Sequence, residues 1–223
     1  LKKIGFLSGQ GEPDLQQLSR VQEILAKQYQ VTTVDLAGGK AIPPEIAVLV
    51  IVAPSQPLKN WEKFLIDQYV MRGGRVAFMI NKVSANLQNQ MGQAVAVNLD
   101  DMLEAYGTRV NTDLVRDVSC AYVTVSQQAG FMVIQNQLPF YYLPRASDFN
   151  KTSPVVKDLG SVVFYFASSV DTTPARAKGL TANVLVRSST KSGRQENVFV
   201  FNPTIQMTQE MFNTLLFAFV ALS

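Results

Sequence analysis

Hydrophobic residues near the start of the chain gather in short continuous runs. The run Val48–Val52 is β-branched at four of its five positions, which is typical of a strand buried on both faces. Pro54 and Pro57 follow it and end its pairing, because proline cannot donate a ladder hydrogen bond. Three further runs of this kind predict strands, at Ile4–Ser8, Val31–Leu36 and Arg75–Ile80.

Between Trp61 and Met71 the apolar residues change to helical spacing. We expect Trp61, Phe64, Leu65 and Tyr69 to line one apolar face of this helix, which Ile66 and Val70 widen. Gly73-Gly74 then gives the backbone the freedom to end it. Strand, helix and strand joined by short loops form a crossover unit, so Val48–Val52 and Arg75–Ile80 should lie parallel in one sheet.

Two more helices are predicted. Pro13 suits the first position of a helix, and an amphipathic stripe follows it at Leu15, Leu18, Val21, Leu25 and Tyr29. A short helix is expected over Leu99–Tyr106, ending at Gly107. Its acidic residues, Asp100, Asp101 and Glu104, are interpreted as a solvated face.

The second half of the chain is richer in strand-like segments. Val118–Val125 and Phe131–Gln135 predict a β-hairpin, and Leu138–Pro144 an aromatic edge or lid. Further strands are expected at Val162–Phe166, Ala182–Val186 and Asn197–Phe201. The polar runs Lys82–Asn98 and Ser188–Gln195 are interpreted as loops, and Thr208 is expected to cap a final helix across 208–222.

These elements predict an α/β fold class: a mostly parallel, Rossmann-like sheet with helices on both faces and additional strands in the second half. We expect one domain over residues 1–223. Its Rossmann-like core would cover 1–117, and a β-rich extension over 118–223 would complete the sheet.

Composition removes several classes of chemistry. The 223 residues include one cysteine, Cys120, and no histidine. An internal disulfide, a multi-cysteine metal site and any Ser-His or Cys-His nucleophile pair are therefore excluded. Cys120 is interpreted as a buried structural thiol. The net charge of +3 comes from scattered residues, so no nucleic-acid surface is expected.

The candidate ligand site lies at two predicted strand ends, where α/β sheets place ligands. Its residues are Ser8, Gly9, Gln10, Gly11 and Glu12 in one loop and Pro54 and Ser55 in the other. As a dinucleotide fingerprint the first loop fails, because Asp14 stands at the third glycine position and Pro13 lacks a backbone donor. We therefore expect no cofactor and no metal, and no catalytic residue.

Three stretches carry a family resemblance: KKIGFLSGQGEPDL at the start, VLVIVAPSQPL…EKFLIDQYVMRGGRVAFMIN, and LDDMLEAYGTRVNTDLVRD. Together with FYYLPRASDFNKTSPVVKDLGSVVFYFASSVDT they resemble the auxiliary domain of ABC-type transport systems. The resemblance is greatest to the gliding-motility-associated component GldG of Bacteroidetes-type bacteria. It implies an amidotransferase-like or intraflagellar-transport-like α/β domain that is not known as an enzyme.

The resemblance also implies where the protein works. It indicates an extracytoplasmic (periplasmic) domain of a membrane-anchored subunit whose partners are an ABC permease and ATPase or other envelope proteins. No run within the chain reaches the roughly 20 apolar residues that span a bilayer, and the chain begins at Leu1. We therefore expect a segment of a longer protein, with its membrane anchor outside this sequence.

Two functions remain open from the sequence. The first is a non-catalytic interaction domain of a transport or gliding-motility machine. The second is an amidotransferase-like domain that binds a small polar ligand, such as a sugar, in the crevice between the two strand-end loops.

Overall fold

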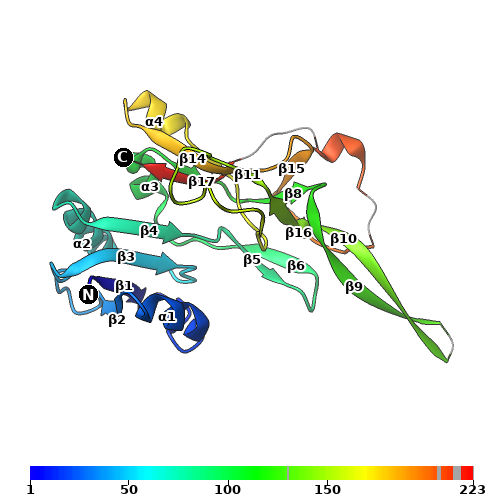
Figure 1. Cartoon of the computed structure of the whole chain (residues 1–223), viewed down its shortest axis with the longest axis horizontal. Coiled ribbons are helices and arrows are strands. Elements are labelled where there is room, and N and C mark those ends of the chain that lie inside the picture. The colour runs from blue at the N-terminus through cyan, green and yellow to red at the C-terminus, as the bar shows by residue number, and fades with distance from the viewer. Residues whose placement is uncertain (130, 205–206, 213–216, 223) are drawn as a thin grey trace. The chain divides into compact units, whose positions relative to one another are not determined.

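The computed structural model describes residues 1–129, 131–204, 207–212 and 217–222 (Figure 1). The chain divides into two compact units. Unit 1 comprises Leu1–Asn81 and Val95–Met102, and unit 2 comprises Lys82–Ala94 and Leu103–Ser223. The chain therefore leaves unit 1, returns to it for a short segment, and leaves again.

Unit 1 is built on a four-stranded parallel sheet. Its strands are β1 (Lys3–Ser8), β2 (Gln30–Asp35), β3 (Ile46–Val52) and β4 (Arg75–Met79), in the order β2-β1-β3-β4. β3 pairs with β4 in parallel, with Val48 opposite Arg75 and Val52 opposite Met79. The predicted parallel crossover is thus confirmed, and all four predicted strands are present.

The helices of unit 1 differ from the prediction in extent and orientation. α1 (Ser19–Ala26) begins well after Pro13 and contains no buried residue. Apolar residues around it, Leu15, Leu18, Leu25 and Tyr29, pack against a small cluster formed by Ile4, Phe6 and Val50. α2 (Asn60–Met71) buries Leu65, Ile66 and Tyr69, as expected. Trp61 and Phe64, which were predicted to share the apolar face with Leu65 and Tyr69, are exposed.

Unit 2 consists mainly of short antiparallel pairings. The largest joins β9 (Cys120–Ala129) to β10 (Met132–Ala146), with β12 (Val162–Val163) on the other side of β10. β14 (Ala182–Arg187) lies between β11 (Asp148–Phe149) and β17 (Phe217–Leu222). A third small sheet has the order β16-β6-β5, with β5 at Val83–Asn86, β6 at Met91–Ala94 and β16 at Phe199–Val200. Two further pairs are β7 (Arg109–Val110) with β13 (Val170–Asp171), and β8 (Asp113–Asp117) with β15 (Ser192–Glu196).

Two hydrophobic clusters hold unit 2 together. Aromatic residues dominate the larger one, where Phe140, Tyr142, Phe199 and Phe201 pack with Leu114. The smaller cluster joins Phe149 and Val186 to Val156. Two short α-helices belong to the described residues as well: α3 (Asp100–Tyr106), whose predicted end before Gly107 is confirmed, and α4 (Thr173–Ala177).

The predicted fold class is wrong for the chain as a whole. Parallel pairing is confined to β1–β4, and the strands that follow pair antiparallel in several small sheets. Four α-helices are present in the described residues, two of them with seven residues or fewer. After β4 the chain pairs antiparallel, in hairpins such as β9–β10 and between strands distant in sequence such as β8 and β15. It therefore does not extend one helix-flanked, Rossmann-like sheet.

Three local predictions also need correction. The final helix expected over 208–222 is a 3-10 turn at Gln209–Phe212 followed by strand β17, while residues 213–216 lie outside the described part. Lys82–Asn98 contains the β5–β6 pair instead of being a loop throughout. Ser188–Gln195 leads into β15, where Ser192 is buried.

Candidate functional site

The two loops predicted to form a site lie against each other in unit 1. The strand order β2-β1-β3-β4 reverses direction between β1 and β3, and ligands of open parallel sheets bind beyond the strand ends at such a reversal. Backbone N–H groups of Ser55 and Gln56 donate to the carbonyl oxygen of Gln10 at 3.0 and 2.9 Å. Ser55 Oγ donates to the carbonyl oxygen of Gly11 at 3.1 Å. The structure therefore brings Gln10, Gly11 and Ser55 of the predicted site into contact, whereas the Ser8 hydroxyl donates to the carbonyl oxygen of Val34.

Backbone conformation makes this close approach possible. Gly9 and Gly11 have φ angles of 114° and 76°, which favour glycine because a Cβ atom is strained there. At Gly11 an added Cβ would lie 2.1 Å from Ser55 Oγ. Ala53, at the end of β3, adopts a φ of 42° and donates its N–H to the Met79 carbonyl oxygen at 2.7 Å. The loop pair is thus tightly fitted.

Sequence reasoning missed the residue that joins this loop to α2. Glu62, only 2% exposed, accepts a hydrogen bond from Gln10 Nε2 at 3.1 Å and another from the Lys59 N–H at 2.8 Å. An acid in the first turn of a helix also favours the helix dipole. A signal was available: Glu stands three residues after Lys59, the spacing of a capping box.

Two buried acceptor oxygens at this site have no hydrogen-bond donor. Gln10 donates its backbone N–H to one Glu12 carboxylate oxygen at 2.8 Å. Within the described residues, Gln10 Oε1 and Glu12 Oε1 are buried side-chain atoms without a hydrogen-bond partner. Gln10 itself is 5% exposed. Unpaired buried acceptors are costly, so these oxygens suit a ligand or water that donates hydrogens, and the Glu12 carboxylate disfavours a phosphate.

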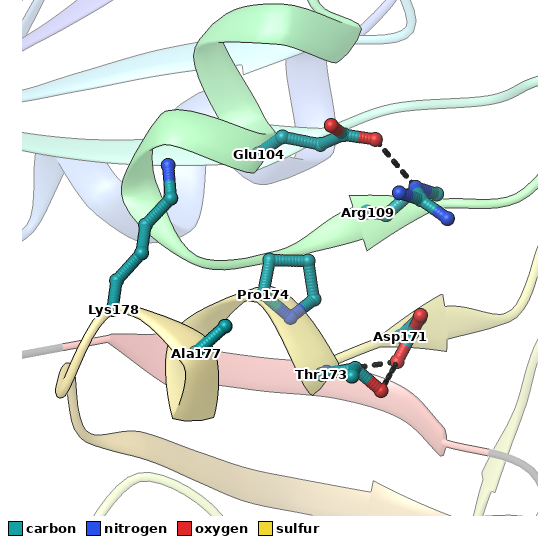
Figure 2. A pocket seen from close by; sticks show the side chains of 7 residues that line it. All are labelled: Glu104, Arg109, Asp171, Thr173, Pro174, Ala177 and Lys178. Atoms are coloured by element: carbon teal, nitrogen blue, oxygen red, sulfur yellow. Dashed lines mark hydrogen bonds and ion pairs between the residues drawn. The ribbon is translucent and has the colours of Figure 1, made fainter.

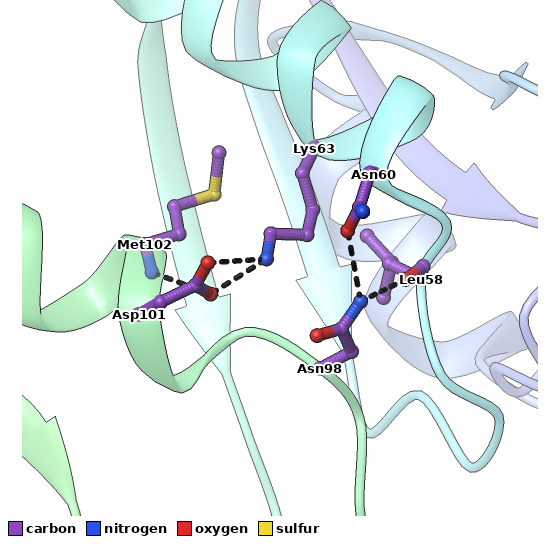
Figure 3. A network of polar contacts seen from close by, with 6 residues as sticks. All are labelled: Leu58, Asn60, Lys63, Asn98, Asp101 and Met102. Carbon is purple, nitrogen blue, oxygen red and sulfur yellow. Dashed lines mark hydrogen bonds and ion pairs between the residues drawn. The ribbon is translucent and has the colours of Figure 1, made fainter.

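Polar contacts also fix the start of α2 to the segment that returns to unit 1 (Figure 3). Lys63 Nζ lies 2.6 and 2.7 Å from the two carboxylate oxygens of Asp101. Asn98 Nδ2 donates to the Leu58 carbonyl oxygen at 2.7 Å. The hydrogen bond from Lys63 holds the pKa of Asp101 below its ordinary value. Asp101, predicted to be only a solvated acid, is exposed but paired.

The opposite side of α2 carries an exposed apolar stripe. Trp61 and Phe64 stack with ring centroids 5.1 Å apart, and their exposed fractions are 55% and 47%. Met71, further along the same helix, is 73% exposed. Aromatic side chains of this kind carry much of the energy at protein interfaces. We refer to Trp61, Phe64 and Met71 as the α2 stripe.

The buried acids of unit 2 have structural partners. Asp113 accepts the Ser169 N–H at 2.8 Å and the Ser169 hydroxyl, while burial raises the pKa of Asp113. Asp117 accepts N–H groups from Ser119 and Ser189 at 2.8 and 2.7 Å. Both carboxylates come from β8, four residues apart, and each fastens a serine of a loop distant in sequence. Both side chains are fully buried, so their hydrogen bonds are structural.

Cys120 is buried, as predicted. Burial raises the pKa of its thiol, which lowers the fraction of reactive thiolate.

A shallow depression of about 310 Å³ lies on unit 2 (Figure 2). It is lined by Glu104, Arg109, Asp171, Thr173, Pro174, Ala177 and Lys178. Glu104 pairs with Arg109. Asp171 accepts from the N–H and hydroxyl of Thr173 at 2.8 and 2.6 Å, and the hydroxyl bond is the main reason that its pKa is lowered. Three of the four charged side chains are thus already engaged within the protein.

Among the described residues, no cluster of three or more His, Cys, Asp or Glu side chains could hold a metal ion. None of the helices in that part of the chain is both long and apolar enough to cross a membrane.

Comparison with known proteins gives two findings. The family model described as ABC-type uncharacterized transport system matches residues 1–219. A solved structure described as "mmIFT52 N-terminal domain" is similar with a TM-score of 0.58 and 15% identity, over 85% of this chain and 74% of that one. At this identity the similarity concerns the fold alone. No curated protein sequence matches the chain.

Proposed function

Because the chain belongs to the ABC-type uncharacterized transport system family, we propose that it acts as a non-catalytic interaction domain of a transporter auxiliary subunit. Its partners would be the permease and ATPase of the transport system or other envelope proteins. The buried carboxylates Asp113 and Asp117 are occupied by structural hydrogen bonds. The thiol of Cys120 is buried. These features favour recognition over turnover.

The α2 stripe is the observation that carries this proposal. Trp61 and Phe64 extend from a helix whose other side is anchored by Leu65, Ile66 and Tyr69. The Tyr69 hydroxyl donates to the Ile46 carbonyl oxygen at 3.0 Å, joining α2 to β3. A rigid helix that presents stacked aromatic rings to solvent loses little side-chain freedom when a partner covers them. We assign the α2 stripe as the docking surface for the permease.

Co-purification from membranes tests this assignment. The full auxiliary subunit carrying a tag would be purified with the permease from gently solubilised membranes, as wild type and as the W61S and F64S variants. We expect both variants to recover much less permease. The matched control is I24S, which removes an apolar side chain of similar exposure from α1 and should leave recovery unchanged. Equal recovery with all four proteins would contradict the assignment.

The location and the cellular process are finer proposals. We place the domain on the extracytoplasmic face of the inner membrane, in a machine associated with gliding motility, on the strength of the GldG-like stretches in its sequence. Protease added to intact spheroplasts should digest this domain of the subunit, and deletion of its gene should stop colony spreading. Protection from protease would contradict the location. Normal spreading would contradict the link to gliding.

A second candidate function rests on the two unpartnered acceptors. Gln10 Oε1 and Glu12 Oε1 lie beside the point where the strand order reverses, and two hydroxyls of a sugar could each donate to one of them. A thermal-shift screen with soluble glycans tests it, because a ligand that binds the folded state raises its apparent stability. We expect stabilisation of the wild type that is lost in E12Q. No shift with any glycan would remove this candidate.

A further inference from the structure

The β9–β10 hairpin of unit 2 leaves its distal part uncovered. Its base packs on the larger cluster of the unit through Ala121, Val123, Phe140 and Tyr142. Beyond that base Figure 1 shows the two strands continuing as a narrow ribbon away from the other strands of the unit. Val133 and Ile134, successive residues that point to opposite faces of the ribbon, are both exposed. A two-stranded ribbon without cover on either face is only marginally stable in water.

The outer edge of β9 lacks every usual protection against a further strand. β9 is the last strand in the order β12-β10-β9, and within the described residues it pairs with β10 alone. Exposed edges are normally blocked by charged side chains, proline or a bulge. No charged residue occurs between Asp117 and Arg145, and β9 contains no proline. Its pairing from Ala121 to Ala129 is continuous, without a register shift.

The other edge of the hairpin, along β10, is interrupted from Pro139 towards its base. Pro139, opposite Tyr122 in β10, has no N–H to give to a neighbouring strand. A register shift follows between Phe140 and Pro144. Near its end, β10 is already paired with β12 at Arg145 and Ala146. From Pro139 to Ala146 the edge of β10 is therefore closed to a new strand, whereas the edge of β9 is uninterrupted from Ala121 to Ala129.

We propose that this edge binds a second copy of the chain, with β9 pairing antiparallel to β9 across a two-fold axis. Self-pairing brings residues near the axis opposite themselves or close neighbours, so any charge there would face its like. β9 is free of charge along its whole length. With the axis through Val125, Thr124 faces Ser126 of the second copy and Tyr122 faces Gln128 of the second copy. The exposed side chains thus meet as uncharged, hydrogen-bonding pairs.

The symmetry limits the size of the assembly. An isologous contact uses the same surface on both copies and closes at a dimer. The two hairpins would form one four-stranded sheet in which each β9 gains a partner on its open side. The inference is independent of the α2 stripe, which lies in unit 1, and goes beyond the proposed docking function.

Sedimentation equilibrium of the 223-residue protein over a wide concentration range tests the proposal, with T124K as the disrupting variant. We expect a monomer–dimer equilibrium in the wild type that T124K weakens by on the order of tenfold, since the two lysines then lie on one face of the new sheet as diagonal neighbours across the axis. The matched control is Q137K. Gln137 lies opposite Thr124 on β10, so the same charge is placed away from the β9 edge and should leave the dimer intact.

A crosslinking experiment keeps the proposal testable if T124K folds poorly. In V125C the new thiols would meet at the axis and form an intermolecular disulfide under mild oxidation, whereas Q137C would not. A protein that stays monomeric at every concentration, a dimer broken by Q137K but not by T124K, growth into longer oligomers, or no crosslink in V125C would each overturn the proposal.

Discussion

At the scale of single residues, the strand-end loops are defined by how closely two backbones approach. Gly11 combines a positive φ with a neighbouring hydroxyl that leaves no room for a side chain. The sequence pattern Gly-Gln-Gly-Glu predicted a loop there, but the interlocking of Gly11 with Ser55 depends on a neighbour 44 residues away. Such a contact becomes visible only once β1 and β3 are known to be adjacent.

Replacing Gly11 by alanine should destabilise unit 1. We expect a loss of about 1–3 kcal/mol in the free energy of unfolding, because the Cβ is strained at this φ and collides with Ser55 Oγ. Gly38→Ala is the matched control, since an added Cβ at Gly38 has no atom within 4 Å. Chemical denaturation of both variants measures the difference. Equal stabilities would show that the loops are not packed as described.

The buried Asp113 gives the protein a specific dependence on pH. Its pKa is raised chiefly by burial, so above the ordinary carboxyl pKa the folded state binds more protons than the unfolded state. Stability contributed by this group is therefore present at low pH and falls as the pH rises through the raised pKa. Asparagine keeps a carbonyl acceptor for Ser169 but does not ionise.

Urea denaturation of the wild type and D113N at a series of pH values measures this effect. The difference in unfolding free energy, wild type minus D113N, should decrease as the pH rises from about 4 towards neutrality. D148N, which removes the charge of an exposed acid in the same unit, is the control for the loss of a negative charge alone. A difference that increases with pH would contradict the assigned cause of the shift.

At the scale of elements, a prediction from sequence succeeded where the hydrophobic pattern is compatible with only one kind of secondary structure. The β-branched run Val48–Val52 is compatible with a buried strand and little else, and it forms strand β3 in the structure. The last segment of the chain is apolar almost throughout, so it satisfies helical and strand periodicities alike. This segment forms strand β17 because it pairs with β14, which is distant in sequence.

The orientation of α2 shows a second limit of prediction from sequence. Its apolar residues occupy more than one face, so spacing alone could not separate the buried side from the exposed one. The anchors are Leu65, Ile66 and Tyr69, together with the polar links of Glu62 and Lys63. Trp61 and Phe64 are left in solvent as a consequence.

Contacts at the start of α2 should contribute measurably to the attachment of residues 95–102. K63M removes the ion pair with Asp101 while retaining the apolar part of a side chain that is 11% exposed. We expect a loss of about 1 kcal/mol in unfolding free energy, because Asp101 is exposed and well solvated. Hydrogen exchange at the Met102 amide, which bonds to Asp101, should also accelerate. K3M, which removes an exposed pair with Glu45, provides the control; equal effects of K63M and K3M would contradict a special role for Lys63.

At the scale of the whole molecule, a parallel-sheet unit and a unit of small antiparallel sheets occur in one chain. The sequence predicted the first unit well, because crossover connections are local and strongly patterned. It predicted the second less well, since short strands such as β6 and β15 are polar and pair with strands that are distant in sequence. The ligand role of Ser8, Gly9, Gln10, Gly11, Glu12, Pro54 and Ser55 stays a prediction. The structure adds Glu62 and the α2 stripe.

Site-specific photocrosslinking in living cells tests the central claim, that α2 docks on the permease, most directly. A photoreactive phenylalanine analogue would replace Phe64 in one strain and Ile24 in another, and covalent adducts would be identified by mass spectrometry after irradiation. The account predicts a permease adduct from position 64 and none from position 24. Absence of a permease adduct at position 64, with the subunit present at its normal level, would contradict it.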